Sequence, residues 1–196
     1  RQVTDDDIGL LVLREVPADV AEAIDVIAIH GIGAHPDDSW SKNVGTRESP
    51  KWVNWLVEES MLPAVVPHAR IMRYGYQSQW FGEGAMRQNV STVADRLLLA
   101  LRRKRKDYPS RPILFIAHCF GGLVMLAAAR QEYQEDEVQP DVLRILEPGN
   151  EFLQEIVDQF GKTRKQANKA QVACFYELKL SNVGSIVGQQ NRMVNS

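Results

Sequence analysis

The chain has 196 residues, of which 44% are hydrophobic and 24% are charged, and its formal net charge at pH 7 is −2. This length predicts a single domain over residues 1–196, and the small net charge gives no reason to expect nucleic acid as a partner. No segment approaches the roughly 18 apolar residues of a membrane-spanning helix, and two cysteines make no disulfide framework, which favours a reducing, cytoplasmic location.

Short apolar runs rich in β-branched or aromatic residues alternate with segments of helical spacing. The runs cover residues 8–12, 24–29, 69–74, 113–116 and 172–176. This alternation predicts an α/β fold, in which a mostly parallel sheet carries helices on both faces. In the last run, Cys174 is interpreted as a core residue.

A His-Gly-x-Gly sequence follows the second apolar run, at residues 30–33. Such a loop typically supplies a backbone N–H group that stabilises the oxyanion of an acyl-transfer intermediate, and the loss of one donor costs about 3 kcal/mol of barrier. The predicted donors are the amides of Ile32 and Phe120. His30 precedes the candidate nucleophile, whereas this architecture places its base last in the chain, so we expect His30 to shape the loop.

Two helices are predicted between the loop and the next candidate site. The first starts at Ser49, with Pro50 in its first turn, and points Trp52, Trp55 and Leu56 inward. The second has an apolar face formed by Val90, Val93, Ala94, Leu97, Leu98 and Leu101.

The second helix ends in five consecutive cations at residues 102–106. One interpretation is attraction to an anionic membrane surface, worth about 1 kcal/mol per residue near the lipid. The other, which we favour, is a solvated helix end whose cations complement the helix dipole.

The fourth apolar run leads directly into Ala117-His118-Cys119-Phe120-Gly121-Gly122 and then into a helical pattern. A strand that turns sharply into a helix strains the residue at the corner and requires small neighbours, here Ala117 and Gly121. Cys119 occupies the corner of this predicted nucleophile elbow, where the positive end of the helix favours a thiolate. The alternative is that Cys119 is a small buried hydrophobic residue.

Taken together, these segments resemble an α/β-hydrolase of the lipase-like group that includes the eukaryotic serine-active-site-containing proteins and the N-terminal hydrolase domains of fungal NACHT-type receptors. The matching segments are residues 30–33 with Trp40, residues 69–76, residues 118–124 and residues 171–177. The resemblance implies an α/β-hydrolase fold and an esterase, lipase or acyltransferase activity on an ester or lipid substrate, with no metal or cofactor. It also implies that the chain belongs to a longer protein whose other domains are its partners.

The chain departs from this family at three places. Cys119 stands where the family has serine, no histidine follows Cys119, and no apolar strand lies near residues 133–141, so the fold looks incomplete there and at the C-terminus. Glu177 is our candidate for the acid that orients a histidine, with a surface or structural carboxylate as the alternative. His35 and His68 are expected to face solvent, and the side chain of His118 is expected to pack inward.

Three interpretations follow. In the first, Cys119 is the nucleophile of a hydrolase whose histidine lies outside this sequence. In the second, the domain is a catalytically silent module for ligand sensing or for assembly within a larger receptor. In the third, Cys119 is an introduced replacement for a native serine.

Overall fold

The computed structural model describes residues 1–16, 20, 22–79, 89–133, 173, 181–182 and 193–194. The chain divides into two compact units, Arg1–Thr163 and Arg164–Ser196. The first unit holds a four-stranded sheet. In the second, the described elements are the antiparallel pair β7 (Ser181–Asn182) and β8 (Met193–Val194). The single domain predicted over residues 1–196 stays a prediction.

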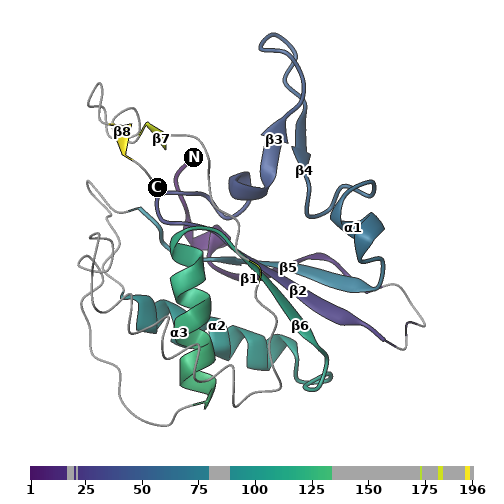
Figure 1. The fold of residues 1–196 in the computed structure, drawn as a ribbon, viewed down its shortest axis with the longest axis vertical. Coiled ribbons are helices and arrows are strands. Elements are labelled where there is room, and N and C mark those ends of the chain that lie inside the picture. Colours follow the sequence, from purple (N-terminus) through teal and green to yellow (C-terminus); the bar gives the residue numbers. More distant parts are fainter. Residues whose placement is uncertain are drawn as a thin grey trace. The chain divides into compact units, whose positions relative to one another are not determined.

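The sheet of the first unit has the strand order β1-β5-β2-β6 (Figure 1). Strands β2 (Ile24–Ile29), β5 (Ala69–Gly75) and β6 (Ile113–Ala117) are mutually parallel, whereas β1 (Gly9–Arg14) runs antiparallel to β5. The prediction of a mostly parallel sheet in an α/β fold is therefore confirmed for this unit. The strand predicted at residues 172–176 lies outside the described residues, apart from Ala173, which is exposed and in no element.

The two faces of strand β2 pack against different layers, because successive side chains point to opposite sides of a sheet. Ile27 and Ile29 belong to a core shared with helices α2 (Val90–Lys104) and α3 (Phe120–Tyr133), which lie on the same side of the sheet in Figure 1. Asn89 begins α2, since its side chain accepts a hydrogen bond from the amide of Thr92 at 2.8 Å. The predicted apolar face of α2 is confirmed, with Leu98 partly buried and the other five residues buried.

The opposite face of the sheet is covered by the segment between β2 and β5. Val26 and Ala28 pack there against Trp40 and Leu56, with Leu62 at the edge of the cluster. The elements of this segment are the 3-10 helix η2 (Asp38–Trp40), strands β3 (Ser41–Asn43) and β4 (Trp52–Asn54), and helix α1 (Leu62–Val65). A further 3-10 helix, η1 (Asp5–Asp7), precedes β1.

The prediction of a helix starting at Ser49 is wrong. Residues 41–54 form an antiparallel hairpin of β3 and β4, and Trp52 is 66% exposed rather than buried. The side-chain oxygen of Asn43 accepts hydrogen bonds from the amides of Gly45 and Lys51, both at 2.9 Å. This local bonding competes with the helix that Ser49 and Pro50 would otherwise start, because Asn side chains readily stabilise turns.

A buried carboxylate anchors the end of the sheet opposite the loop at residues 30–33. Asp25, near the start of β2, is fully buried and accepts two hydrogen bonds from Arg70 at 2.9 Å. Arg105 donates to the same carboxylate at 2.9 Å, and Arg111 donates at 3.3 Å. Arg105 therefore belongs to an internal ion cluster, and the basic run at residues 102–106 is not a uniform solvated surface.

Candidate functional site

Cys119 lies at the sharp turn between β6 and α3 and has a φ of 53°. It is the one described residue other than glycine with a positive φ, a backbone conformation that costs an L-residue roughly 1–2 kcal/mol. Its free thiol is exposed, which contradicts the alternative of a buried hydrophobic cysteine. The sequence prediction of a strained, accessible residue at this corner is confirmed.

The elbow contacts the loop that follows β2. The amide of His118 donates to the carbonyl of Ile29 at 3.0 Å, which holds the ends of β6 and β2 together. A β-carbon placed on Gly31 would lie 2.9 Å from Cβ of Cys119 and 3.0 Å from Nδ1 of His118. Only glycine fits here, so this contact requires the Gly of the His-Gly-x-Gly sequence.

The two predicted oxyanion donors follow the residues in this contact. Ile32 comes directly after Gly31, and Phe120 comes directly after Cys119. Within the part of the chain that the structure describes, neither amide donates a hydrogen bond to a protein group. Phe120 is also the first residue of α3, where backbone N–H groups have no partner inside the helix. With respect to the described residues, both amides are thus left to donate to another acceptor.

His30 is a structural residue of this loop, as the sequence predicts. It is fully buried, its Nδ1 lies 3.0 Å from the carbonyl oxygen of Gly31, and its Nε2 accepts the amide of Tyr76 at 3.2 Å. These contacts fit the neutral tautomer that carries its proton on Nδ1. Burial lowers the pKa of His30 to about 4, because the charged imidazolium is costly away from water. With both ring nitrogens occupied, His30 is not free to act as a base.

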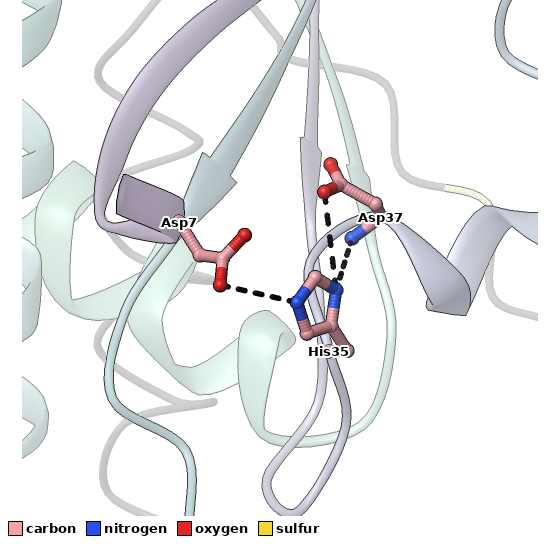
Figure 2. Close-up of side chains that lie close together, drawn as sticks. All are labelled: Asp7, His35 and Asp37. Atoms are coloured by element: carbon pink, nitrogen blue, oxygen red, sulfur yellow. Dashed lines mark hydrogen bonds and ion pairs between the residues drawn. The ribbon is translucent and has the colours of Figure 1, made fainter. Parts of the chain in front are cut away.

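The prediction that His35 faces solvent is wrong. Its side chain is 1% exposed and lies between two carboxylates (Figure 2). Nε2 faces Oδ2 of Asp7 at 3.2 Å, and Nδ1 accepts the amide of Asp37 at 3.1 Å. The N-terminal segment brings Asp7 to the ring and helps to bury it. The local sequence around His35 does not indicate this contact.

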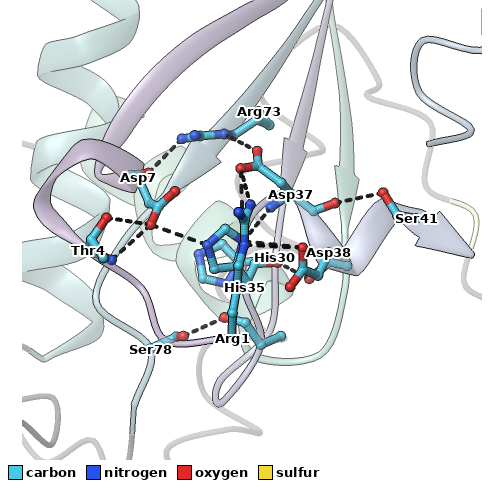
Figure 3. A network of polar contacts seen from close by, with 12 residues as sticks. Arg1, Thr4, Asp7, His30, His35, Asp37, Asp38, Ser41, Arg73 and Ser78 are labelled. Carbon is cyan, nitrogen blue, oxygen red and sulfur yellow. Dashed lines mark hydrogen bonds and ion pairs between the residues drawn. The ribbon is translucent and has the colours of Figure 1, made fainter. Parts of the chain in front are cut away.

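Asp7, His35 and Asp37 place donor atoms within 4.8 Å of one another, a spacing that also suits a metal ion. Cations of the protein already occupy this site, however (Figure 3). Arg73 donates to Asp37 at 2.8 Å, and Arg1 donates to the same carboxylate at 3.0 Å. Two guanidinium groups on one carboxylate oppose a further positive charge, so this cluster is explained as an ion-pair network that fixes the far end of the loop.

Asp7 is held in its charged form within this network. Its carboxylate accepts hydrogen bonds from the amide of Thr4 at 2.9 Å and from the Thr4 hydroxyl at 2.8 Å. The bond from the Thr4 amide is the largest of the effects that lower the pKa of Asp7 to about 2, and His35 adds to them. The Asp7 carboxylate therefore stays ionised above about pH 2 and keeps its contact with Nε2 of His35.

The remaining predicted residues divide between described and undescribed parts of the chain. His68 is exposed, as expected, whereas His118 is exposed instead of packed inward. The expectation for His118 fails because its ring lies alongside Gly31, which offers no side chain to cover it. Glu177 and Cys174 lie outside the described residues, so their predicted roles stay predictions.

Two residues of the site escaped the sequence analysis. Tyr76 and Ser78 follow β5 and form hydrogen bonds with the loop after β2. A signal for them was present, because the carboxyl ends of parallel strands meet at one edge of a sheet, where ligand sites form. Residues just after β5 therefore had to lie near the loop and the elbow.

Comparisons of the chain with protein-family models, with curated proteins and with solved structures found no match. In the part of the chain that is described, no helix has the length and apolar character needed to cross a membrane.

Proposed function

We propose that this chain has an α/β-hydrolase fold and transfers acyl groups through Cys119, with the amides of Ile32 and Phe120 as the oxyanion hole. The observation that carries the proposal is the exposed thiol on a strained turn, beside a loop in which the Ile32 amide donates to no protein group among the described residues. Strain of this kind persists only where surrounding structure enforces it, and it gathers at functional sites. A core cysteine has no need of such a backbone.

The reaction begins with attack of the Cys119 thiolate on the carbonyl carbon of an ester or thioester. A carbon–sulfur bond forms, and the carbonyl electron pair moves to oxygen, where the two amides would donate to the negative charge. Collapse of this intermediate breaks the bond to the alcohol or thiol, which leaves and takes a proton from water. The product is an acyl thioester on Cys119.

Release of the acyl group requires a base to activate water or another acceptor. The chain has four histidines, and both ring nitrogens of His30 and His35 face protein groups. His68 precedes β5 and so lies at the opposite end of that strand from the elbow, while His118 adjoins Cys119. The proposal therefore expects acylation to be faster than deacylation, so that the thioester accumulates.

The test is intact-mass spectrometry after exposure to p-nitrophenyl esters of several acyl lengths. One acyl adduct should form on the wild-type chain and none on Cys119→Ala, whereas Cys174→Ala should react like the wild type. The rates of acylation and of alkylation by iodoacetamide are each divided by the rate for a free thiol such as N-acetylcysteine. The ratio for acylation should be the larger, because only acylation builds charge on a carbonyl oxygen. Absence of an adduct at Cys119 with every ester would overturn the proposal.

A silent sensing or assembly module is the second candidate. It is favoured by the contacts of His30 and His35, because the ring nitrogens of both imidazoles already face protein groups. Such a module would bind a lipid or a further domain of its protein, and the wild type and Cys119→Ala would bind with equal affinity. Calorimetric titration of both forms with a lipid ester separates the two functions, because an enzyme would also release alcohol in a Cys119-dependent manner.

A further inference from the structure

The segment that follows β5 binds the loop after β2 at several points. The amide of Gly33 donates to the carbonyl of Ser78 at 2.6 Å, and the hydroxyl of Ser78 donates to the carbonyl of Ala34 at 2.5 Å. Ser78 is itself buried, at 2% exposure. The part of the loop that directly follows Ile32 is therefore fixed to Ser78.

Tyr76 binds the start of the same loop in three ways. Its ring stacks on the imidazole of His30, with the ring centroids 4.2 Å apart and the planes inclined by 21°. Its amide donates to Nε2 of His30, and its hydroxyl donates to the carbonyl of His30 at 2.8 Å. Tyr76 thus contacts both the ring of His30 and its backbone carbonyl, and it holds the two in place.

Tyr76 also reaches the other half of the candidate oxyanion hole. Its ring centroid lies 6.1 Å from that of Phe120, at an angle of 45°. Burial is the main cause that raises the pKa of the Tyr76 hydroxyl, so the hydroxyl stays protonated and keeps its bond to the loop. One side chain therefore contacts His30, two residues before Ile32, and Phe120, the residue that follows Cys119.

We propose that Tyr76 is a positioning residue, which holds the Ile32 amide beside the Phe120 amide so that both donate to one carbonyl oxygen. This inference rests on the proposed acyl transfer. The hydroxyl is the informative part, because a phenylalanine would fill the same apolar space without needing a partner. A buried hydroxyl is tolerated only when it is bonded, and this one is bonded to the loop.

The test compares two reactions of Cys119 in two tyrosine variants. Tyr76→Phe removes the bond to the loop, whereas Tyr74→Phe removes an equally buried hydroxyl that donates to the carbonyl of Val93 at 2.9 Å in α2. Acylation by a p-nitrophenyl ester uses the oxyanion hole, while alkylation by iodoacetamide builds no charge on a carbonyl and does not. Both rates are measured by intact mass, with far-UV circular dichroism as the check on folding.

In Tyr76→Phe, Cys119 should be acylated about tenfold more slowly, while its rate of alkylation stays unchanged. The loss is moderate because the Ile32 amide is displaced but not removed. Tyr74→Phe should leave the ratio of the two rates as in the wild type. An unchanged ratio in Tyr76→Phe, or an equal fall in both reactions, would overturn the positioning role while leaving acyl transfer intact. A wild-type chain that is alkylated but never acylated would overturn acyl transfer itself, and the inference with it.

Ser78→Ala provides a second variant in case Tyr76→Phe does not fold. It removes the bond to the carbonyl of Ala34 from the same segment and should lower the ratio of acylation to alkylation about threefold, a smaller effect because Ser78 contacts the loop beyond Ile32. If Tyr76→Phe is unfolded and Ser78→Ala keeps the wild-type ratio, the segment after β5 supports the fold alone and the inference is wrong.

Discussion

Gly121 lies so close to the backbone of His30 that a β-carbon at position 121 would be 2.6 Å from the His30 carbonyl oxygen. It would also be 2.4 Å from the carbonyl oxygen of Ile29. The first turn of α3 therefore rests directly on the end of β2, with no side chain between them. This contact sets how near the elbow and the loop approach each other, and it explains the small residue two positions after Cys119.

Gly121→Ala is expected to destabilise the protein by roughly 1–3 kcal/mol, since the added methyl group meets backbone oxygens that cannot rotate away. Gly122→Ala is the matched control, because a β-carbon there meets nothing within 4 Å and alanine favours helix by up to about 1 kcal/mol. Urea unfolding of the two variants should give changes of opposite sign. Equal effects would contradict the close contact of α3 with β2.

Cys119→Gly should be more stable than Cys119→Ala by about 1 kcal/mol. Glycine adopts the positive φ of this position without the steric cost that any β-carbon brings, and this gain exceeds the entropy that glycine adds to the unfolded chain. Comparing two variants that both lack the thiol removes any effect of the sulfur atom. Thermal unfolding in which the alanine variant is as stable as the glycine variant would contradict the strain at the elbow.

The sequence predicted the elements of the site that depend on local chemistry. The strands at 24–29, 69–74 and 113–116 are short runs rich in β-branched or aromatic residues, a local pattern that favours strands. The corner at Cys119 likewise carries its small neighbour in the chain itself. Local sequence is enough to predict such elements, because the residues that impose each structure lie within a few positions of it in the chain.

The failures involve partners that are distant in the chain. His35 is buried by Asp7, which is 28 residues away, and Tyr76 is 46 residues from His30, so no local pattern indicates either contact. The helix expected at Ser49 fails because Asn43 and Lys51 close a hairpin around it. Contacts of this kind follow from the strand order, which places residues distant in the chain at the same edge of the sheet.

Asp25→Asn is expected to destabilise the protein by about 3–5 kcal/mol, since it leaves the guanidinium groups of Arg70, Arg105 and Arg111 without their buried counter-charge. Glu132→Gln removes an ion pair of similar length, 2.9 Å to Arg102, but both of those side chains are exposed. Its cost should stay below about 1 kcal/mol. Similar urea midpoints for the two variants would show that the Asp25 cluster is not an essential part of the fold.

The buried imidazole of His30 should make stability fall as the pH is lowered from about 7.5 to about 5. The folded state holds the pKa of His30 at about 4, whereas the unfolded chain has a value of about 6.5, so the unfolded state binds the extra proton in this interval. The stability contributed by neutral His30 is therefore fully present above about pH 6.5 and is lost progressively as the pH falls to about 4. The loss at pH 5 should be about 2 kcal/mol.

Urea unfolding at both pH values, for the wild type and for His30→Gln, isolates this effect from other titrating groups. Glutamine offers an acceptor for the Tyr76 amide but carries no charge at either pH, so the variant should be less stable at pH 7.5 and should lose less stability on acidification. His68→Gln, at an exposed position, controls for the loss of an imidazole and should follow the wild type. If His30→Gln and the wild type lose the same stability between the two pH values, then His30 is protonated in the folded protein, and its bond to the Tyr76 amide does not form as described.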